Sequence, residues 1–348
     1  MRGDAGGRPH VSRRVHLGPA VLGRQTDMVN AVCTVRIAQR ELLASAGGDH
    51  AVRVWDPATG IPEHTLEGHT KWVEEVCAVR VAGRGELLAS GGADHIVRIW
   101  DPATGVPERT MEAHTGWVNG VCTVHVDGHE MLASAGTDAT VRIWDPVTGV
   151  LERTLEGHTG WVNGICVVHV DGSEVLASAG TDEIRIWDPA AGRPVRSLEG
   201  HTGWIRGVCA VRGEGPELLA SAGDDATVRI WNPATGVLER TLEAHTGQVN
   251  AVCAVRGDGR ELLASAGTDG TVQIWDPATG VLQRSLEGHA GWVNGVCAVH
   301  ADGRELLASA GDDATVRIWD PATGVLERTL EADTDRPQRR VHRPSGQP

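Results

Sequence analysis

The sequence predicts an all-β fold, a β-propeller of seven blades in which each blade is a four-stranded antiparallel sheet. Three observations predict it. One pattern recurs seven times, with steps of 43 to 45 residues between successive copies. Each copy contains four short apolar or alternating segments separated by turn residues. A sheet of this kind has apolar faces on both sides, and a closed ring of sheets gives every face a neighbour.

The repeat is marked by two residue types. A Trp-Asp pair, or a near match to it, ends the third segment of each copy, and its tryptophans are Trp55, Trp100, Trp144, Trp187, Trp231, Trp275 and Trp319. One cysteine per copy keeps the same spacing, and these are Cys33, Cys77, Cys122, Cys166, Cys209, Cys253 and Cys297. The regular spacing predicts one propeller domain over residues 21–331. We expect the Arg-, Pro- and Gly-rich segments 1–20 and 332–348 to be disordered.

The four segments of a copy each have a recognisable pattern. The commonest forms are "WVNGVCAV", "LLASAG", "TVRIW" and "VLERTLE". The first three are apolar and rich in small or β-branched residues, and the fourth alternates Glu and Arg on what we expect to be the outer edge, where charge discourages pairing with other chains. Asp-Gly, Gly-x-Asp and Asp-Pro-Ala-Thr-Gly separate them and suit tight hairpin turns.

With a Gly-His near its start and a Trp-Asp near its end, the repeat resembles those of the WD-repeat (WD40) family. Stretches such as "EGHTGWVNGIC" (156–166) and "MEAHTGWVNGVC" (111–122) carry the resemblance, which spans residues 21–331. The near-identity of the copies is typical of bacterial members. The resemblance implies a seven-bladed propeller that assembles protein complexes.

Two segments compete for the outer strand of the seventh blade. Residues 325–330 continue the seventh repeat in register, whereas residues 15–23 form a weaker N-terminal candidate. We favour residues 325–330. The seventh blade is then contiguous, and the ring is expected to close by side-to-side packing alone.

The recurring histidines admit a catalytic or a structural interpretation. His158, Ser178 and Asp182 suggest a catalytic triad, but the same residue types recur in most copies, which favours structure. The resemblance implies a hydrogen-bonded tetrad of His, Asp, Ser and Trp inside each blade. Its members are His69, His114, His158, His201, His245 and His289; Asp94, Asp138, Asp182, Asp225, Asp269 and Asp313; and Ser134, Ser265, Trp144 and Trp275.

Three copies depart from this pattern. The first has Gln25 in place of histidine, opposite Asp49; the fourth lacks one residue between Asp182 and Trp187; and Asp333 replaces histidine after the seventh. We expect the first and fourth blades to be the least stable, the fourth through a tightened turn or a strained tetrad.

Metal, nucleic-acid, membrane and disulfide chemistry are not indicated. Each cysteine stands alone without Cys-x-x-Cys spacing, which favours free, buried thiols in a reducing cytoplasm and no metal or other cofactor. The net charge of −14 argues against nucleic acid and anionic membranes as partners. No segment has the roughly 20 apolar residues of a transmembrane helix.

The resemblance places three positions per repeat at the mouth of the central channel, on the narrow face. The first position holds Met28, Trp72, Trp117, Trp161, Trp204, Gln248 and Trp292. The second holds Asn30, Glu74, Asn119, Asn163, Arg206, Asn250 and Asn294. The third holds Gly48, Ala93, Thr137, Thr181, Asp224, Thr268 and Asp312. Five tryptophans in one ring predict a binding surface for a protein or peptide, although the indoles alternatively fold over one another as padding.

The function predicted is a non-enzymatic scaffold or adaptor, monomeric as an isolated propeller, with a peptide or protein bound at this mouth. Lys71, Glu74, Glu75 and Arg206 break the seven-fold pattern by charge and would orient the ligand. The alternatives are a sensor module or fragment of a larger bacterial signalling protein and a glycan-binding propeller. An enzyme is disfavoured because the deviating residues form no acid–base or metal set.

Overall fold

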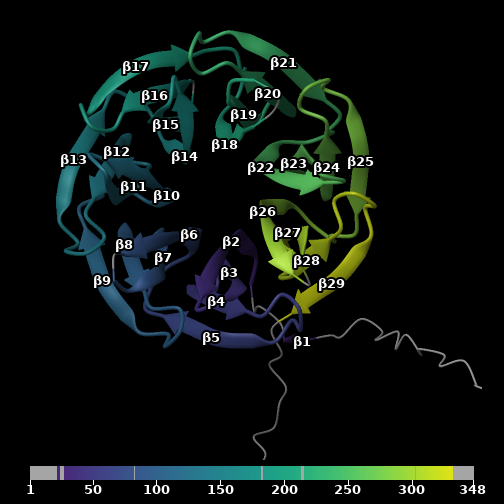
Figure 1. Ribbon diagram of the computed structural model, residues 1–348, viewed down its shortest axis with the longest axis horizontal. Coiled ribbons are helices and arrows are strands. Elements are labelled where there is room, and N and C mark those ends of the chain that lie inside the picture. The colour runs from purple at the N-terminus through teal and green to yellow at the C-terminus, as the bar shows by residue number, and fades with distance from the viewer. Residues whose placement is uncertain are drawn as a thin grey trace, which may run out of the picture.

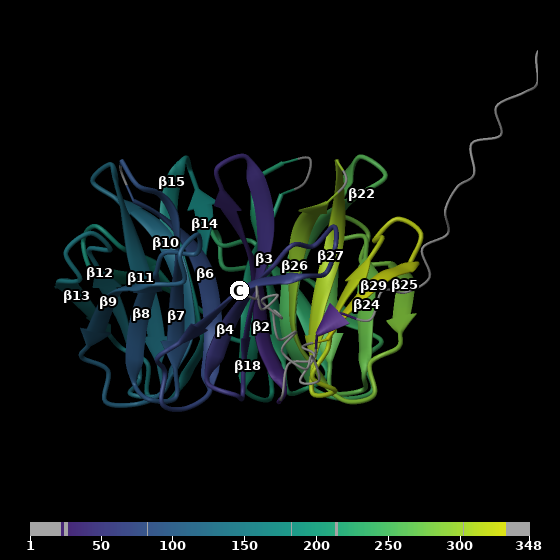
Figure 2. The ribbon, with the colours of Figure 1, turned by 90° about the horizontal axis from the view of Figure 1, so that it is seen from below.

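The computed structural model describes residues 22–23, 27–81, 83–181, 183–212, 215–301 and 303–331. Within these ranges the chain forms seven antiparallel sheets around a central opening, which confirms the predicted seven-bladed propeller (Figure 1). In side view the inner strands run through the thickness of the ring (Figure 2). None of the described segments is a helix long and apolar enough to span a membrane. The segments 1–20 and 332–348, expected to be disordered, lie outside the described residues.

Each blade uses its four strands in sequence order from the channel outward, and blades one to seven follow the seven repeats. The inner strands are β2 (Val29–Ile37), β6 (Val73–Val81), β10 (Val118–Val126), β14 (Val162–Val170), β18 (Ile205–Val211), β22 (Val249–Gly257) and β26 (Val293–Ala301). The second strands are β3 (Arg40–Gly47), β7 (Gly85–Gly92), β11 (His129–Gly136), β15 (Ser173–Gly180), β19 (Leu218–Gly223), β23 (Arg260–Gly267) and β27 (Arg304–Gly311). The third strands are β4 (Ala51–Trp55), β8 (Ile96–Trp100), β12 (Thr140–Trp144), β16 (Ile184–Asp188), β20 (Thr227–Trp231), β24 (Thr271–Trp275) and β28 (Val316–Trp319). The outer strands are β5 (Pro62–Glu67), β9 (Pro107–Glu112), β13 (Leu151–Glu156), β17 (Arg193–Leu198), β21 (Leu238–Glu243), β25 (Leu282–Glu287) and β29 (Leu326–Glu331).

The hairpin turns use the residues that the sequence pattern indicates. Between β10 and β11, Asp127 and Gly128 both have positive φ angles, 51° and 80°, as a type I′ turn requires. Between β12 and β13, the Asp145 carboxylate accepts hydrogen bonds from the backbone N–H groups of Val147 and Thr148. These turns hold the strands of each blade in register, and successive blades therefore have the same strand pairing.

The hydrophobic core lies between the blades. One cluster combines Val79, Leu87 and Ile99 of blade two with Leu132 and Trp144 of blade three, all of them nearly or fully buried. Another joins blades seven and one in the same way. Every blade therefore contributes one apolar face to each neighbour, which is why an isolated sheet of this sequence has no core of its own.

A ring of glutamates links every pair of adjacent blades. In each case a glutamate near the start of one blade's second strand accepts a hydrogen bond from a backbone N–H near the end of the preceding blade's inner strand. The pairs are Glu86 with Arg36, Glu130 with Arg80, Glu174 with His125, Glu217 with His169, Glu261 with Arg212, Glu305 with Arg256, and Glu41 with His300. We call these contacts the glutamate clamps. They lie on the face opposite the channel mouth.

Removal of a glutamate clamp is expected to destabilise the ring. E130A deletes the acceptor 2.6 Å from the Arg80 N–H, and we expect it to lower the free energy of unfolding by about 1 kcal/mol in urea denaturation. E41A, which opens the clamp between blades seven and one, should have a similar effect. The matched control is E239A, an exposed position on β21. Loss of no more stability than in E239A would contradict a role for the clamps.

The ring does not close by side-to-side packing alone, so this expectation was wrong. The choice of outer strand is confirmed, because Leu326–Glu331 forms β29, the fourth strand of a contiguous blade seven. However, Leu22–Gly23 forms an additional short strand, β1, which pairs in parallel with Leu330 and Glu331. The His300–Glu41 clamp also spans this junction. The N-terminal segment therefore adds a fifth strand outside blade seven instead of replacing its fourth.

Candidate functional site

The recurring His, Asp, Ser and Trp residues of blade three form the hydrogen-bonded tetrad that the resemblance implies. The Nδ1 atom of His114 lies 3.0 Å from Oδ2 of Asp138, and its Nε2 atom lies 2.7 Å from the Ser134 hydroxyl. The Trp144 indole N–H donates to the same hydroxyl at 2.8 Å. A neutral imidazole satisfies every partner: it donates from Nδ1 and accepts from serine at Nε2. A Cβ on Gly136 would lie 2.7 Å from His114 Nδ1, so the small residue makes room for the ring.

Equivalent contacts occur in the other blades as far as the structure describes them. The His-Asp pairs are His69 with Asp94, His201 with Asp225, His245 with Asp269, and His289 with Asp313. In blade six the chain of contacts continues through Ser265 to Trp275. Burial lowers the pKa of His201 and of His245. Their aspartates oppose this shift, but burial has the larger effect, so both imidazoles remain neutral. The repetition and burial make these groups structural elements of the blades.

Blades one and four, whose repeats depart from the common pattern, each have a tetrad position that the structure does not describe. Gln25 of blade one and Asp182 of blade four lie outside the described residues. In blade four His158 still contacts Ser178 at 2.7 Å, and the pairing of β15 with β16 keeps the usual register. Blade three pairs Ala135 with Val141 across the corresponding turn, whereas blade four pairs Ala179 with Ile184, so the missing residue falls in the turn. The backbone N–H of Gly180 donates to the Glu183 carbonyl across it.

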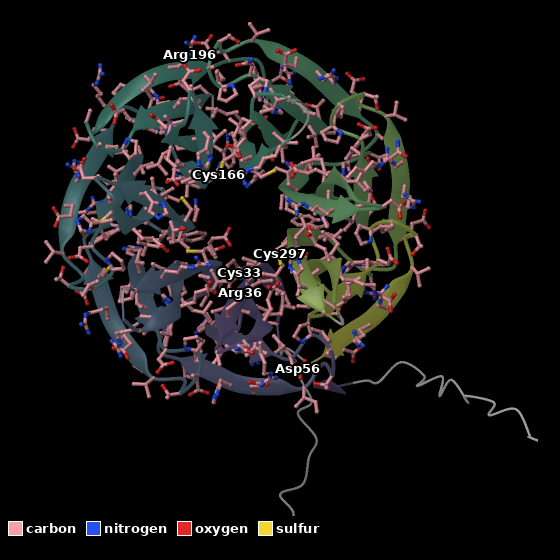
Figure 3. All side chains as sticks on the ribbon, viewed as in Figure 1. Cys33, Arg36, Asp56, Cys166, Arg196 and Cys297 are labelled. Carbon is pink, nitrogen blue, oxygen red and sulfur yellow. The ribbon has the colours of Figure 1, made fainter. Side chains whose placement is uncertain are left out.

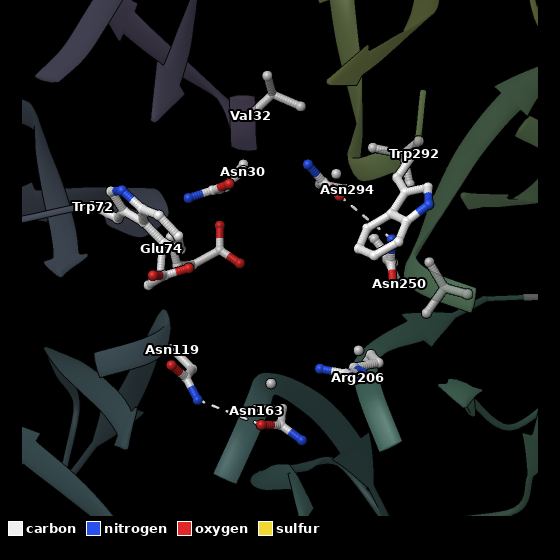
Figure 4. A pocket seen from close by; sticks show the side chains of 18 of the residues that line it. Asn30, Val32, Trp72, Glu74, Asn119, Asn163, Arg206, Asn250, Trp292 and Asn294 are labelled. Atoms are coloured by element: carbon white, nitrogen blue, oxygen red, sulfur yellow. Dashed lines mark hydrogen bonds between the residues drawn. The ribbon is translucent and has the colours of Figure 1, made fainter. Parts of the chain in front are cut away.

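A β-bulge in every inner strand places the second set of mouth positions. In blade three Val118 pairs with Gly136 and Gly120 pairs with Ala135, which leaves Asn119 as the extra residue. A bulge of this kind re-aims its side chain, here toward the channel. The same shift occurs at Asn30, Glu74, Asn163, Arg206, Asn250 and Asn294. All seven line a central cavity of about 560 Å³ (Figure 4).

Five of these bulge residues bridge adjacent blades. The side-chain amide of each asparagine donates to the backbone carbonyl of the first residue of the next inner strand. The pairs are Asn30 with Val73, Asn119 with Val162, Asn163 with Ile205, Asn250 with Val293, and Asn294 with Val29. The last pair closes the ring. Sequence reasoning assigned these asparagines to ligand contact alone and missed this bridging role, because the next blade's carbonyl is distant in sequence.

The five tryptophans of the first mouth position form an indole collar, defined as Trp72, Trp117, Trp161, Trp204 and Trp292. Their exposed fractions range from 40% to 54%, whereas all seven Trp-Asp tryptophans are buried. The rings of Trp72 and Trp117 lie 6.4 Å apart, and those of Trp161 and Trp204 lie 5.3 Å apart. Four of the five indoles therefore contact one another in two pairs. The collar still leaves a large indole surface open at the mouth, beside Met28 and Gln248 of blades one and six.

The backbone holds the collar in place through the third mouth position. The N–H of the residue before the turn aspartate donates to the carbonyl of the first-position residue in six blades. The pairs are Gly48 with Met28, Ala93 with Trp72, Thr137 with Trp117, Asp224 with Trp204, Thr268 with Gln248, and Asp312 with Trp292. Four of the five collar tryptophans are thus anchored through the backbone to a turn of their own blade.

The charges of blades five and seven at the mouth are already paired. Arg206 makes two contacts with Asp224, at 2.6 and 3.0 Å, and its guanidinium lies 5.1 Å from the centre of the Trp204 ring. Asp312 accepts a hydrogen bond from Asn294 at 2.8 Å. Trp204 and Asp224 do not line the cavity itself, whereas Arg206 and Asp312 do. Arg206 is consequently held by the protein and less free to orient a ligand than the sequence indicated.

Blade two differs from the others by two adjacent carboxyl groups. Glu74 occupies the bulge position, and Glu75 occupies a position that is glycine or alanine in every other blade. Burial raises the pKa of Glu74 to about 7. Burial, reinforced by repulsion from Glu74, raises the pKa of Glu75 to about 8, although the Val76 N–H opposes the shift. Both groups line the cavity.

The seven cysteines are free thiols on the inner strands, and Figure 3 shows Cys33, Cys166 and Cys297 around the centre of the ring. They pack against the core clusters between blades; Cys77, for example, lies against the cluster of blades two and three. Burial raises the pKa of Cys166 and of Cys253 to about 12, with smaller effects from Glu217 and Glu305 respectively. The described residues contain no group of three His, Cys, Asp or Glu side chains that could hold a metal ion.

Comparison with protein families identifies the repeat. The family model described as "WD domain, G-beta repeat" matches residues 60–101, 105–145, 149–188, 192–232, 236–276 and 280–320. Each match runs from the outer strand of one blade to the third strand of the next. It thus spans the junction between two blades, where the core clusters lie.

Curated relatives match over short stretches. The chain is 45% identical over 49 residues to nuclear distribution protein nudF 1 of Talaromyces marneffei, which is 14% of this chain and 11% of that protein. It is 46% identical over 41 residues to nuclear distribution protein PAC1-2 of Uncinocarpus reesii, or 12% and 9%. It is 59% identical over 32 residues to the probable serine/threonine-protein kinase PkwA of Thermomonospora curvata, or 9% and 4%. The matches thus cover about a tenth or less of these relatives.

Proposed function

Since this chain belongs to the WD40 repeat family, whose domains are generally non-catalytic and typically serve as protein-interaction scaffolds, we propose that it is a scaffold or adaptor that binds a protein or peptide at the channel mouth. The indole collar carries the proposal. All 12 aromatic residues of the chain are tryptophans, and five of them stand half-exposed in one ring. Indoles contribute large contact areas and are enriched in binding hot spots.

The shape of the mouth supports a peptide segment as the ligand. Four of the five collar indoles, all except Trp204, line a cavity of about 560 Å³ that has polar bulge residues along its wall. A protruding loop or an extended peptide can place side chains in such a cavity and cover the indoles with its flanks. The net charge of −14 supports a protein partner over a nucleic acid.

The proposal is tested by pairing a collar variant with a matched surface variant. Partners are captured on the purified chain and quantified by mass spectrometry in parallel with W117A/W161A and with V237A/V281A. Val237 and Val281 are each 54% exposed at the outer strands, so the control removes apolar surface away from the mouth. We expect the collar variant to lose its partner by at least tenfold, about 1.4 kcal/mol or more, and the control to keep it.

The same capture experiment can also contradict the proposal. Both variants should keep the far-ultraviolet circular dichroism and the urea midpoint of the parent within the small range expected of surface substitutions. If W117A/W161A is folded and still captures the same partner at the same level, the mouth is not the binding surface.

A second candidate is a sensor module of a larger signalling protein. The 59% identity over 32 residues with a probable serine/threonine-protein kinase favours it. In that case the collar would bind a ligand whose arrival is reported to an attached effector. Free thiols in all seven blades are consistent with a reducing compartment such as the cytoplasm for either candidate.

A further inference from the structure

Among the described residues of the cavity wall, the two carboxyl groups of blade two are the only charged side chains with no hydrogen bond to another side chain. Four charged residues line the cavity: Glu74, Glu75, Arg206 and Asp312. Arg206 is paired with an aspartate and Asp312 with an asparagine amide. The Oε1 atom of Glu74 is buried and accepts no hydrogen bond from any described residue. Glu75 accepts one from the adjacent Val76 N–H, at 3.0 Å.

Comparison among the blades shows that these carboxyl groups are not required for the fold. Where blade two has Glu74, five blades have an asparagine that bridges to the next blade. Where blade two has Glu75, blade four has Gly164, and a Cβ there would lie 2.9 Å from the carbonyl oxygen of Arg206 in blade five. Blade two therefore gives up a bridge and places a longer side chain in a narrow position. Its cross-strand neighbour is Gly91, whereas the other blades have alanine there; a Cβ on Gly91 would lie 2.6 Å from Cγ1 of Val118, so this glycine makes room for blade three.

The surroundings of the pair are aromatic. Trp72 precedes Glu74 by two residues, and Figure 4 places both on the same wall of the cavity. The ring of Trp117 from blade three meets the Trp72 ring edge-on at 6.4 Å. The thiols of Cys33, Cys77, Cys122 and Cys297 also interact with Glu75, and burial raises their pKa, so they remain neutral. Carboxylates beside indole rings form a site for a cation that has an apolar stem.

We propose that the cavity accepts one lysine or arginine side chain of a peptide partner, whose cationic head is held by Glu74 and Glu75 while its stem lies against Trp72 and Trp117. This inference rests on the proposed function and names the chemistry of the ligand. Two carboxyl groups side by side in a cavity repel one another and lack water, and a cation placed between them removes both penalties. An acidic ligand would meet two carboxyl groups of like charge at this wall.

A bare metal ion fits the site less well. Calcium takes six to eight oxygen ligands and magnesium requires a near-octahedral set, whereas blade two offers two carboxyl groups. A lysine or arginine head needs fewer partners and gains from the indole faces. In the described part of the chain, no three His, Cys, Asp or Glu side chains, these two included, are grouped so that they could hold a metal ion.

The test is a peptide selection on the whole chain followed by matched variants. A displayed library of random twelve-residue peptides is panned over the immobilised protein, and enriched peptides are synthesised. We expect a lysine or arginine at one fixed position, and replacement by norleucine or citrulline should weaken binding at least tenfold. E74N/E75G, which installs the residues of blade three, should show the same loss, whereas E239Q on the exposed outer strand should bind like the parent.

Each outcome decides a separate point. Peptides that bind at the collar, lose affinity in W117A/W161A and show no basic position would overturn this inference and leave the proposed function standing. Unchanged affinity for basic peptides in folded E74N/E75G would overturn it as well. Failure of any peptide to bind the parent counts against both proposals. E74N/E75A, which installs the residue pair of blades one and six, provides a second variant if E74N/E75G does not fold.

Discussion

Replacement of His114 by alanine is expected to lower the free energy of unfolding by about 3 kcal/mol in urea denaturation. The imidazole is buried, and it is the shared partner of the Asp138 carboxylate and the Ser134 hydroxyl. Its removal takes away the acceptor of the Ser134 hydroxyl and one donor to the Asp138 carboxylate, and it opens a cavity beside Trp144. The loss should appear as a lower urea midpoint with an unchanged slope, because the extent of unfolding is the same.

Two control variants show whether the loss of stability comes from the tetrad. H129A removes an exposed histidine from β11 of the same blade and is expected to change the free energy of unfolding by less than about 0.5 kcal/mol. H114Q installs the residue type of repeat one, Gln25, and should fall between the parent and H114A because the amide retains one donor. H245A should resemble H114A, since blade six has the same contacts. If H114A is no less stable than H129A, the structural role of the tetrads is wrong.

The parts of the fold that repeat locally were predictable from the sequence. The tetrad of blade three connects residues 114, 134, 138 and 144, which are close in sequence and lie within one sheet. Local patterns of strand and turn residues fix such a sheet. Seven copies of the pattern then required a ring, because each sheet has two apolar faces. The family resemblance added the pairing of His with Asp, which spacing alone does not give.

Contacts between blades were not predictable in the same way. Glu130 stands at the start of a strand and has the pattern of a solvated charge, yet it accepts a hydrogen bond from the backbone of Arg80 in the preceding blade. Asn294 bonds to Val29 at the other end of the chain. The clamp glutamate recurs in every repeat, but this periodicity does not say which backbone group of the neighbouring blade it contacts, because that depends on packing across the core. The two-residue strand Leu22–Gly23 is too short to be read from sequence pattern.

The candidate site was predictable in position and only partly in detail. The tryptophans of the collar lie at the mouth as the repeat positions indicated. Their arrangement in pairs, and the pairing of Arg206 with Asp224, depend on side-chain packing that the sequence does not specify. The most informative residues, Glu74 and Glu75, were visible as a departure from the repeat. Their burial, and the single missing partner of Glu74, required the structure.

The stability of the chain is expected to fall between pH 4.5 and about 8 because of these two residues. The folded state raises the pKa of Glu74 to about 7 and of Glu75 to about 8, chiefly through burial. In this window the folded protein retains protons that the unfolded chain, with ordinary carboxyl groups, has released. The folded state binds more protons, so its stability decreases as the pH rises. The loss of stability is complete once the pH exceeds the raised pKa values of both Glu74 and Glu75.

Removal of both carboxyl groups should abolish this loss. We expect the free energy of unfolding of E74N/E75G, relative to that of the parent, to rise by about 3 kcal/mol between pH 4.5 and pH 8.5, as a total for two partly buried groups. Urea denaturation at half-unit steps of pH measures both curves. The asparagine should add a bridge to blade three like that of Asn119 in the next blade, which contributes at every pH.

The range of pH and the choice of control isolate the two glutamates. Above pH 8.5 the seven thiols begin to ionise in the unfolded chain, while burial keeps them protonated in the folded state, so the comparison ends there. Histidines titrate equally in both proteins and cancel in the difference. E239Q, at an exposed position, should follow the parent curve. Parallel curves for the parent and E74N/E75G would show that the carboxyl groups of blade two are solvated, and would remove the reason for a cation to enter the channel beside them.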